Sequence, residues 1–409
     1  MEIEKLKKKS RAYALKNALA HDGKAIIGAV ISSLFVEGLK KEDLKKFGKI
    51  INKIVDEINS LNLEEQKSEF ENLQNQVHER EVREGLPELP NAKKGKVVMR
   101  FAPAPSGALH IGHAVSNVIS SLFVKKYGGK FYVRIEDTNP EKIDLDSYKF
   151  FKEDCDWLFG NVEDYIIQSD RIKIYYDYAK KLIKKNSAYV CTCDPEDFKK
   201  NSEEKIPCEC RKKTIKENET DWKKMLDKKG FKEGEAVLRF KTPEKFGGFS
   251  NPNPAMRDFP LARINLTSHP RQKNKFRVWP LMNLAVPIDD IEFKMTHVIR
   301  GKDHMDNAKR QKMFYQVSGL GKKFPWTFFM GRIKFTDLKL GKRHIKAGIE
   351  SGEFSGWDDE KLPTLVSLRK RGYKPEAFWK FAEQRGLTDV DKVISQKDFF
   401  EVLDRFNRE

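Results

Sequence analysis

The chain has 409 residues, which is too long for one ordinary domain and predicts two to four domains with large buried cores. Lys and Arg number 79 against 61 Asp and Glu, and this formal charge of +18 favours a polyanionic partner such as RNA, DNA or an anionic membrane, unless it reflects only a lysine-biased, solvated surface. No stretch approaches the roughly 18 consecutive apolar residues of a membrane span, and a signal peptide's apolar core is missing, so we expect a cytoplasmic protein.

The first part of the chain has a helical pattern. Residues 25–35 (AIIGAVISSLF) and 47–77 carry apolar residues three and four positions apart, which is typical of amphipathic helices. Pro, Asn, Gly and charged residues then gather in 88–96 (ELPNAKKGK), a composition that indicates a linker. We therefore predict a helical N-terminal region over residues 1–95.

A strand, a loop, a helix and a second strand are predicted next. Residues 96–101 (KVVMRF) are β-rich, 114–127 (AVSNVISSLFVKKY) are helical and end at Gly128, and 130–137 (KFYVRIED) are again β-rich. Such a βαβ unit has a right-handed crossover and a parallel sheet. Ligands of these sheets bind beyond the carboxyl ends of the strands, where the loop lies.

The rest of the chain divides by composition into an insertion and two further regions. Residues 186–277 are lysine-rich and contain cysteines, apolar runs resume at Val278, and the pattern is helical again from about Lys361. The predicted fold class is α/β, with a Rossmann-like parallel sheet and helical ends. In chain order the predicted segments are a helical extension (1–95), the first half of the sheet domain (96–185), the insertion (186–277), its second half (278–335), and a loop with a helical region (336–409).

The predicted loop at 102–113 (APAPSGALHIGH), here called the HIGH loop, suits a triphosphate. His110 and His113 lie on one face of a helix N-terminus, near free backbone N–H groups and the positive end of the helix dipole. Gly112 lets a ligand approach the backbone, and imidazoles can donate to phosphate oxygens. For an isolated H-x-x-H pattern, two polar residues at a helix start would be the more common explanation, and a zinc pair would need a third ligand that is not evident.

The sequence RFAPAPSGALHIGHA resembles the HIGH signature of class I aminoacyl-tRNA synthetases, in the form found in glutamyl-tRNA synthetases. YALKNALAHDGKAIIGAV is similar to the helical extension of archaeal-type members, and RIEDTNP, VIRGKDHMDNAKRQ and SGWDDEKLPTLVSLRKRG are similar to later blocks. The resemblance implies a glutamate–tRNA ligase that uses Mg-ATP and binds the tRNA acceptor stem through residues 186–277. Glutaminyl-tRNA synthetase is an alternative, although that family has a different lead-in and lacks a VIRGKDH block of this form.

A glutamate site needs arginines for two carboxylates and a carboxylate for one ammonium group. Arg100 and Arg300 end predicted strands, as does Glu136, and each alone would more often be a surface ion-pair residue. The resemblance implies that both arginines bind the substrate carboxylates and that Glu136 meets the amino group. The family usually has Ser or Asn where this chain has Ala104, and Tyr where it has Met282. Each change removes a hydrogen-bonding group expected near the substrate, which costs about 0.5 to 1.5 kcal/mol.

Residues 338–349 (LKLGKRHIKAGI) are predicted to be a second ATP element. Class I synthetases carry a mobile KMSKS loop, which has a variant form in the glutamyl and glutaminyl families. Residues 338–349 line up with this variant, and no gap is needed between them and the SGWDD block. This alignment implies that Lys342 is the catalytic lysine that stabilises pyrophosphate and that Arg343 lies beside it, while Gly341 replaces a Ser and His344 a Lys. On composition alone, an ordinary solvated basic loop is the alternative. The implied reaction needs no protein nucleophile, because positioning and charge stabilisation suffice.

Four of the five cysteines form two C-x-C pairs, Cys191 with Cys193 and Cys208 with Cys210, whereas Cys155 stands apart. Four thiolates in two close pairs can hold a tetrahedral zinc ion. The site would be structural, because four protein ligands leave no open position. Four unconnected thiols in a lysine-rich insertion are the alternative.

The resemblance also implies domains beyond Glu409. Members of the family continue into β-barrels that read the anticodon, so we expect either a fragment or a separate chain that supplies the barrels. A rival from another class is an RNA-binding protein that has kept the fold but lost catalysis, which Ala104, Met282 and Gly341 favour and the retained histidines, arginines and Lys342 oppose. A small-molecule nucleotidyltransferase is a third candidate, which the N-terminal helices and the basic insertion oppose.

Overall fold

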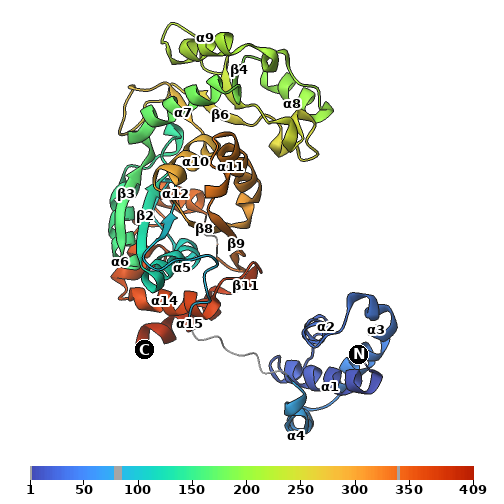
Figure 1. Ribbon diagram of the computed structural model, residues 1–409. Coiled ribbons are helices and arrows are strands. Elements are labelled where there is room, and N and C mark those ends of the chain that lie inside the picture. The colour runs from blue at the N-terminus through green and yellow to red at the C-terminus, as the bar shows by residue number, and fades with distance from the viewer. Residues whose placement is uncertain (1, 78–84, 339–340) are drawn as a thin grey trace. The chain divides into compact units, whose positions relative to one another are not determined.

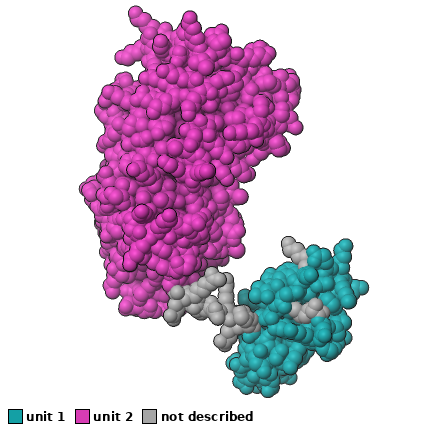
Figure 2. Space-filling model, in the orientation of Figure 1, with its two compact units in different colours: residues 1–82 teal, residues 83–409 magenta. Residues whose placement is uncertain are grey.

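The computed structural model describes residues 2–77, 85–338 and 341–409. It divides into two compact units, residues 1–82 and residues 83–409, shown in teal and magenta in Figure 2. Among the described residues, no helix combines the length and the apolar content needed to cross a membrane.

Unit 1 is built from helices. They are α1 (Ile3–Leu19), α2 (Ile27–Val36), α3 (Leu44–Asn59) and α4 (Leu63–Leu73). Their apolar faces share one core that includes Leu15, Leu34 and Ile51. The start of α4 is fixed by a capping box, in which Asn62 accepts the backbone N–H of Glu65 and the Glu65 side chain accepts that of Asn62.

A parallel sheet forms the centre of unit 2 and confirms the predicted fold class. Its strands are β1 (Val97–Phe101), β2 (Gly129–Ile135), β3 (Val162–Ile167), β8 (His297–Gly301) and β9 (Trp326–Met330). β1, β2 and β3 pair in that order, and β8 pairs with β9. Thr296, directly before β8, donates its backbone N–H to the carbonyl of Val98 at 3.0 Å and so joins the two ladders.

Helices cover this sheet. They are α5 (Ile111–Tyr127), α6 (Asp146–Phe159), α10 (Met282–Glu292) and α11 (Met305–Val317). α5 packs on β1, β2 and β8, and its buried face, including Val115 and Ile119, belongs to the main core. Gly128 ends α5 with a φ of 73°, a conformation that favours glycine, and β2 follows at once.

The predicted insertion, residues 186–277, forms a four-stranded antiparallel sheet with helices together with the elements that flank it, α7 before it and β7 after it. The elements are α7 (Ile172–Lys184), β4 (Ala188–Cys191), α8 (Pro195–Glu204), α9 (Ile215–Leu226), β5 (Val237–Phe240), β6 (Pro260–Ile264) and β7 (Val278–Pro280). The strands pair in chain order, and their core continues into α10 and α11. Figure 1 shows β4, α8 and α9 at the end of unit 2 that lies away from α14 and α15.

The C-terminal region folds back onto the helices of the sheet domain. It contains β10 (Ile333–Phe335), α12 (Lys342–Glu350), α13 (Leu365–Lys370), α14 (Pro375–Arg385), β11 (Lys392–Ile394) and α15 (Gln396–Arg408). α14 packs against α5 and α6, and Phe378 and Phe399 are fully buried in the main core. The helical prediction for this region misses β11, which pairs in parallel with β10.

Candidate active site

The HIGH loop connects β1 to α5, and residues of the C-terminal region complete it. Gly107 has a φ of 129°, and a Cβ atom at this position would lie 2.3 Å from the ring of Trp357, so only glycine fits. On the other side of the loop, the backbone N–H of Leu365 donates to the carbonyl of Leu109 at 2.8 Å. The start of α5 is therefore held between β1 and α13.

The two histidines of the loop are locked by backbone hydrogen bonds. The Nδ1 atom of His110 accepts from the N–H of Gly112 at 3.1 Å, and the Nδ1 atom of His113 accepts from the N–H of His110 at 3.2 Å. A neutral imidazole that accepts at Nδ1 carries its proton on Nε2. Burial, assisted by the Lys342 ammonium group, lowers the pKa of His110 to about 3, and burial also holds the pKa of His113 well below its ordinary value. Both rings are therefore neutral Nε2–H donors at pH 7.

Lys342 reaches the HIGH loop from the first position of α12. Its Nζ atom donates to the carbonyl of Ala104 at 3.3 Å and to that of Gly107 at 3.1 Å. Burial lowers the pKa of Lys342 to about 8. The structure thus brings the predicted catalytic lysine and the predicted histidines together. The side chain of Arg343, predicted beside Lys342, lies outside the described part of the chain.

The predicted glutamate-binding residues gather at the carboxyl edge of the sheet. Arg100 lies near the end of β1, Arg300 near the end of β8, and Glu136 directly after β2. Burial, followed by the charge of Arg100, lowers the pKa of Arg300 to about 10, while Glu136 raises it. The Nε atoms of both arginines are buried and have no hydrogen-bond partner among the described residues. Unsatisfied buried donors are rare, and the Nε group of Arg300 leaves capacity for a carboxylate ligand.

Sequence reasoning missed the ion pairs that hold this group. Arg134 is fully buried and donates from Nη1 to Asp290 at 2.5 Å and from Nη2 to Glu136 at 3.0 Å. Asp290 also lies 3.5 Å from the Nε atom of Arg100. Burial opposes its ionisation, but Arg134 and Arg100 hold the pKa of Asp290 below its ordinary value. The signal was the adjacent pair Asp289 and Asp290 in an apolar segment, because buried carboxylates require cationic partners.

Two residues after β8 were also missed. The buried side chain of Gln311, on α11, accepts from Nη1 of Arg300 at 2.8 Å. Burial, followed by Arg300, lowers the pKa of His304, so this ring is neutral beside the arginines. Neither residue has a sequence signal, because its place beside Arg300 depends on how the end of β8 packs against α11 and the residues before it.

Ala104, Met282 and Gly341 differ from the family pattern that the resemblance implies. Ala104 is exposed in the HIGH loop, and Met282 is the half-buried first residue of α10. Gly341 precedes α12 with a φ of −69°, a value that any residue adopts. The backbone therefore does not require glycine at 341. Like the other site residues, these positions stay predictions as to role.

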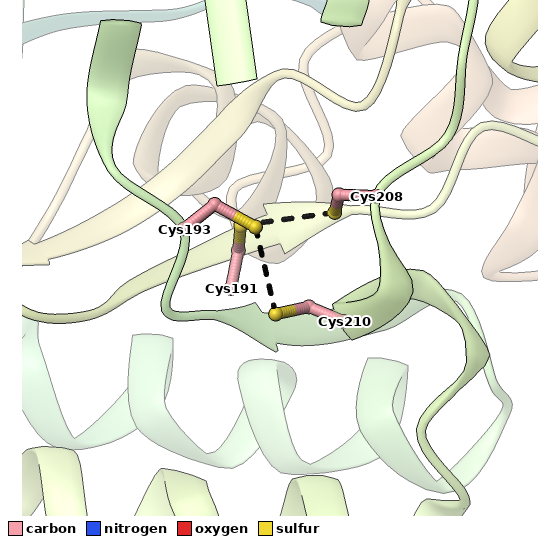
Figure 3. Close-up of side chains that lie close together, drawn as sticks. All are labelled: Cys191, Cys193, Cys208 and Cys210. Carbon is pink, nitrogen blue, oxygen red and sulfur yellow. Dashed lines mark hydrogen bonds between the residues drawn. The ribbon is translucent and has the colours of Figure 1, made fainter. Parts of the chain in front are cut away.

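The four paired cysteines converge, as Figure 3 shows. The Sγ atoms of Cys191 and Cys208 are 3.9 Å apart, those of Cys193 and Cys210 are 3.7 Å apart, and all four lie within 4.8 Å of one another. Sulfur ligands at about 2.3 Å in a tetrahedron around zinc lie about 3.8 Å from one another. Donation from Cys191 lowers the pKa of Cys208 to about 5. The donor set and its spacing therefore fit a four-thiolate metal site.

Comparison with known proteins agrees with this geometry. Residues 96–407 match the family described as tRNA synthetases class I (E and Q), catalytic domain. The chain therefore belongs to this family of class I synthetases for glutamate (E) and glutamine (Q). Similar solved structures include a glutamate tRNA ligase from Elizabethkingia meningosepticum, at 23% identity and a TM-score of 0.52, with 76% of this chain and 69% of that chain covered. That likeness supports the fold.

The curated relatives are more specific. The glutamate–tRNA ligase of Methanocaldococcus jannaschii is 42% identical over 398 residues, which cover 97% of this chain and 70% of the relative. The glutamate–tRNA ligase of Pyrococcus furiosus is 42% identical over 405 residues, with 97% and 69% covered. The predicted archaeal-type family membership is confirmed.

Proposed function

We propose that this protein is a glutamate–tRNA ligase, which activates glutamate with ATP and transfers it to the 3′ end of tRNA. The observation that carries the proposal is the pair of buried guanidinium groups, Arg100 and Arg300, beside Glu136, with the Nε donor of Arg300 unpartnered among the described residues. Two arginines suit the two carboxylates of glutamate, and the Glu136 carboxylate suits its ammonium group. In this arrangement Arg134 and Asp290 orient the binding groups without meeting the substrate.

The HIGH loop and Lys342 would bind ATP next to this amino-acid site. The Nε2–H groups of His110 and His113 would donate to phosphate oxygens, Gly112 would let the nucleotide approach the backbone, and Lys342 would stabilise the departing pyrophosphate. Arg343 would add charge nearby. The family uses ATP with Mg²⁺, which would neutralise the phosphates. The glutamate carboxylate attacks the α-phosphate, and the tRNA ribose hydroxyl then attacks the acyl carbon, so no protein nucleophile takes part.

The test is tRNA-dependent ATP–pyrophosphate exchange with each of the twenty amino acids. We expect exchange with glutamate and at most a trace with glutamine. Exchange with glutamine alone would identify a glutaminyl enzyme. Binding of tRNA without exchange for any amino acid would identify the RNA-binding protein without catalysis.

The insertion is proposed to hold the tRNA acceptor stem, with a zinc ion on Cys191, Cys193, Cys208 and Cys210. The converging sulfur atoms and their spacing support zinc, whose role would be to brace β4 against the turn that carries Cys208 and Cys210. Such a site would be structural, since all four tetrahedral positions are filled by protein.

A separate chain with anticodon-binding barrels stays a prediction. Acceptor-stem contacts to phosphates carry little sequence information, so tRNA identity would come from base contacts elsewhere. Aminoacylation of tRNA transcripts that differ only in the anticodon, by this chain alone and with candidate partner chains added, tests the prediction. We expect poor discrimination by the chain alone and restoration by the partner. Full discrimination by the isolated chain would show that no partner is needed.

A further inference from the structure

The buried amide of Gln311 holds one of the two arginines of the amino-acid site. Gln311 lies on α11, is 3% exposed, and accepts from Nη1 of Arg300 at 2.8 Å. Its own Nε2 group is buried and has no partner among the described residues. Gln311 therefore fixes the guanidinium group through a single neutral acceptor.

The neighbouring buried arginine is held in the opposite way. Arg134 donates to the carboxylates of Asp290 and Glu136 at 2.5 and 3.0 Å, so its charge is matched by anions in direct contact. Arg300 has no carboxylate within salt-bridge distance in the described part of the chain. The positive charge of Arg300 thus remains available to a ligand.

The charge balance of the site follows from this difference. The four side chains whose charges act most strongly on Arg300 are, in chain order, Arg100, Arg134, Glu136 and Asp290. Within this group of five, which includes Arg300 itself, three cations face two anions and leave one unmatched positive charge. The nearby Asp289 does not change the count, because Arg171 donates to it at 2.8 Å. Glutamate carries two carboxylates and one ammonium group, a net charge of −1, whereas glutamine is neutral overall.

We propose that Gln311 is a positioning residue that sets the preference for glutamate over glutamine, by holding Arg300 in place without cancelling its charge. The inference rests on the proposed function, since it assigns the specificity of the same site. A carboxylate at position 311 would make an equally short contact but would satisfy Arg300 and bring the site to net zero. A ligand carboxylate would then have to displace an internal ion pair, which a neutral amide does not require.

The test compares Gln311→Glu with Gln311→Met by tRNA-dependent ATP–pyrophosphate exchange. Gln311→Glu keeps the shape and adds one negative charge. We expect kcat/KM for glutamate to fall about 100-fold, chiefly through KM, with KM for ATP changed less than twofold, because the lost interaction is with the amino acid. The ratio of kcat/KM for glutamate to that for glutamine should fall at least tenfold.

Gln311→Met separates the effect of added charge from that of the lost hydrogen bond. It keeps the size and the net charge but removes the acceptor, so we expect a raised KM for glutamate with the glutamate-to-glutamine ratio within about threefold of the wild type. Gln316→Glu is the matched control, since Gln316 lies on the same helix, is half-buried, and makes no side-chain hydrogen bond within the described region. It should leave the ratio and the KM for glutamate unchanged.

The outcomes are distinct. A wild-type protein that shows no glutamate-dependent exchange overturns the proposed function itself. A wild-type enzyme that activates glutamate, combined with a Gln311→Glu variant of unchanged ratio, overturns only the role of Gln311. A ratio that falls equally in Gln311→Met shows that the lost hydrogen-bond acceptor and not the added charge decides, and also overturns the inference.

Discussion

The fold, and not the solution pH, decides the proton state of the two histidines in the HIGH loop. Both rings accept backbone N–H groups at Nδ1, and burial holds the pKa of His110 near 3. Burial likewise holds the pKa of His113 well below its ordinary value, so both rings are neutral at physiological pH. Lys342 is different, because burial lowers its pKa to about 8, close to physiological pH.

A pH dependence follows for the free enzyme. Lys342 is charged below its pKa and neutral above it, so kcat/KM for ATP should be flat from pH 6 to about 7.5 and fall as the pH rises through about 8. In Lys342→Arg the fall should disappear over this range, since a guanidinium group stays charged. A pH series of the exchange reaction measures this. An unchanged alkaline fall in the arginine variant would assign the titration to another group.

Substitution of Lys342 tests its role directly. Lys342→Ala should lower the rate of adenylate formation at least tenfold, which corresponds to about 1.4 kcal/mol of transition-state stabilisation, with a smaller effect on glutamate binding. Arg343→Ala should do less. If Arg343→Ala proves the more damaging variant in single-turnover measurements, the alignment of residues 338–349 is displaced by one residue.

The residues of the site were predictable to different degrees. The HIGH loop and Lys342 follow from motif and ungapped spacing, and Arg100 follows from the end of a strand. Asp290 had only the weaker signal of an acidic pair in an apolar segment, and Gln311 had none, since their contacts depend on side chains that meet across a strand and a helix. The sequence contains only the residue types, whereas the 2.8 Å contact to Arg300 depends on packing.

At the scale of elements, the sequence predicted best those strands and helices whose own residues carry a periodic pattern. The predicted strand at 96–101 is β1, Val97–Phe101, and the helix predicted from residue 114 begins three residues earlier, because His110 caps it. β11 was missed, since three residues have no measurable periodicity and this strand exists only through its pairing with β10.

The cysteine pairs connect the end of β4 to the turn that carries Cys208 and Cys210. The metal content of this site is measurable. Freshly purified, reduced protein should contain about one zinc ion per chain, and Cys208→Ser should lower both the zinc content and the thermal midpoint, because zinc binding stabilises the folded state. Cys155→Ser is the control for metal content, since Cys155 is buried in α6, outside the cluster. Wild-type protein without zinc would refute the site.

At the scale of the whole molecule, the positive charge is unevenly distributed. Residues 1–82 carry 15 Lys and Arg against 14 Asp and Glu, so almost all of the surplus lies in residues 83–409. Every described residue of the candidate active site also lies there. Unit 1 has a separate hydrophobic core.

Removal of residues 1–82 should therefore leave both chemistry and bulk tRNA attraction in place. We expect glutamate-dependent exchange within about threefold of the full chain. The slope of log affinity for tRNA against log salt should change by less than about one between 50 and 200 mM salt, because that slope counts neutralised phosphates. Fluorescence anisotropy with labelled tRNA measures the slope. If the magnitude of this slope falls by two or more in the shortened protein, unit 1 contributes phosphate contacts.

The contact between Gly107 and Trp357 has a consequence for biosynthesis. The two residues are separated by about 250 positions, which a ribosome needs roughly 12 to 50 seconds to add at 5 to 20 residues per second. Throughout that interval the nascent HIGH loop lacks the indole ring and the Leu365 hydrogen bond that give it its shape. If the HIGH loop binds ATP as proposed, we expect a growing chain to gain a competent nucleotide site only after its C-terminal region has emerged.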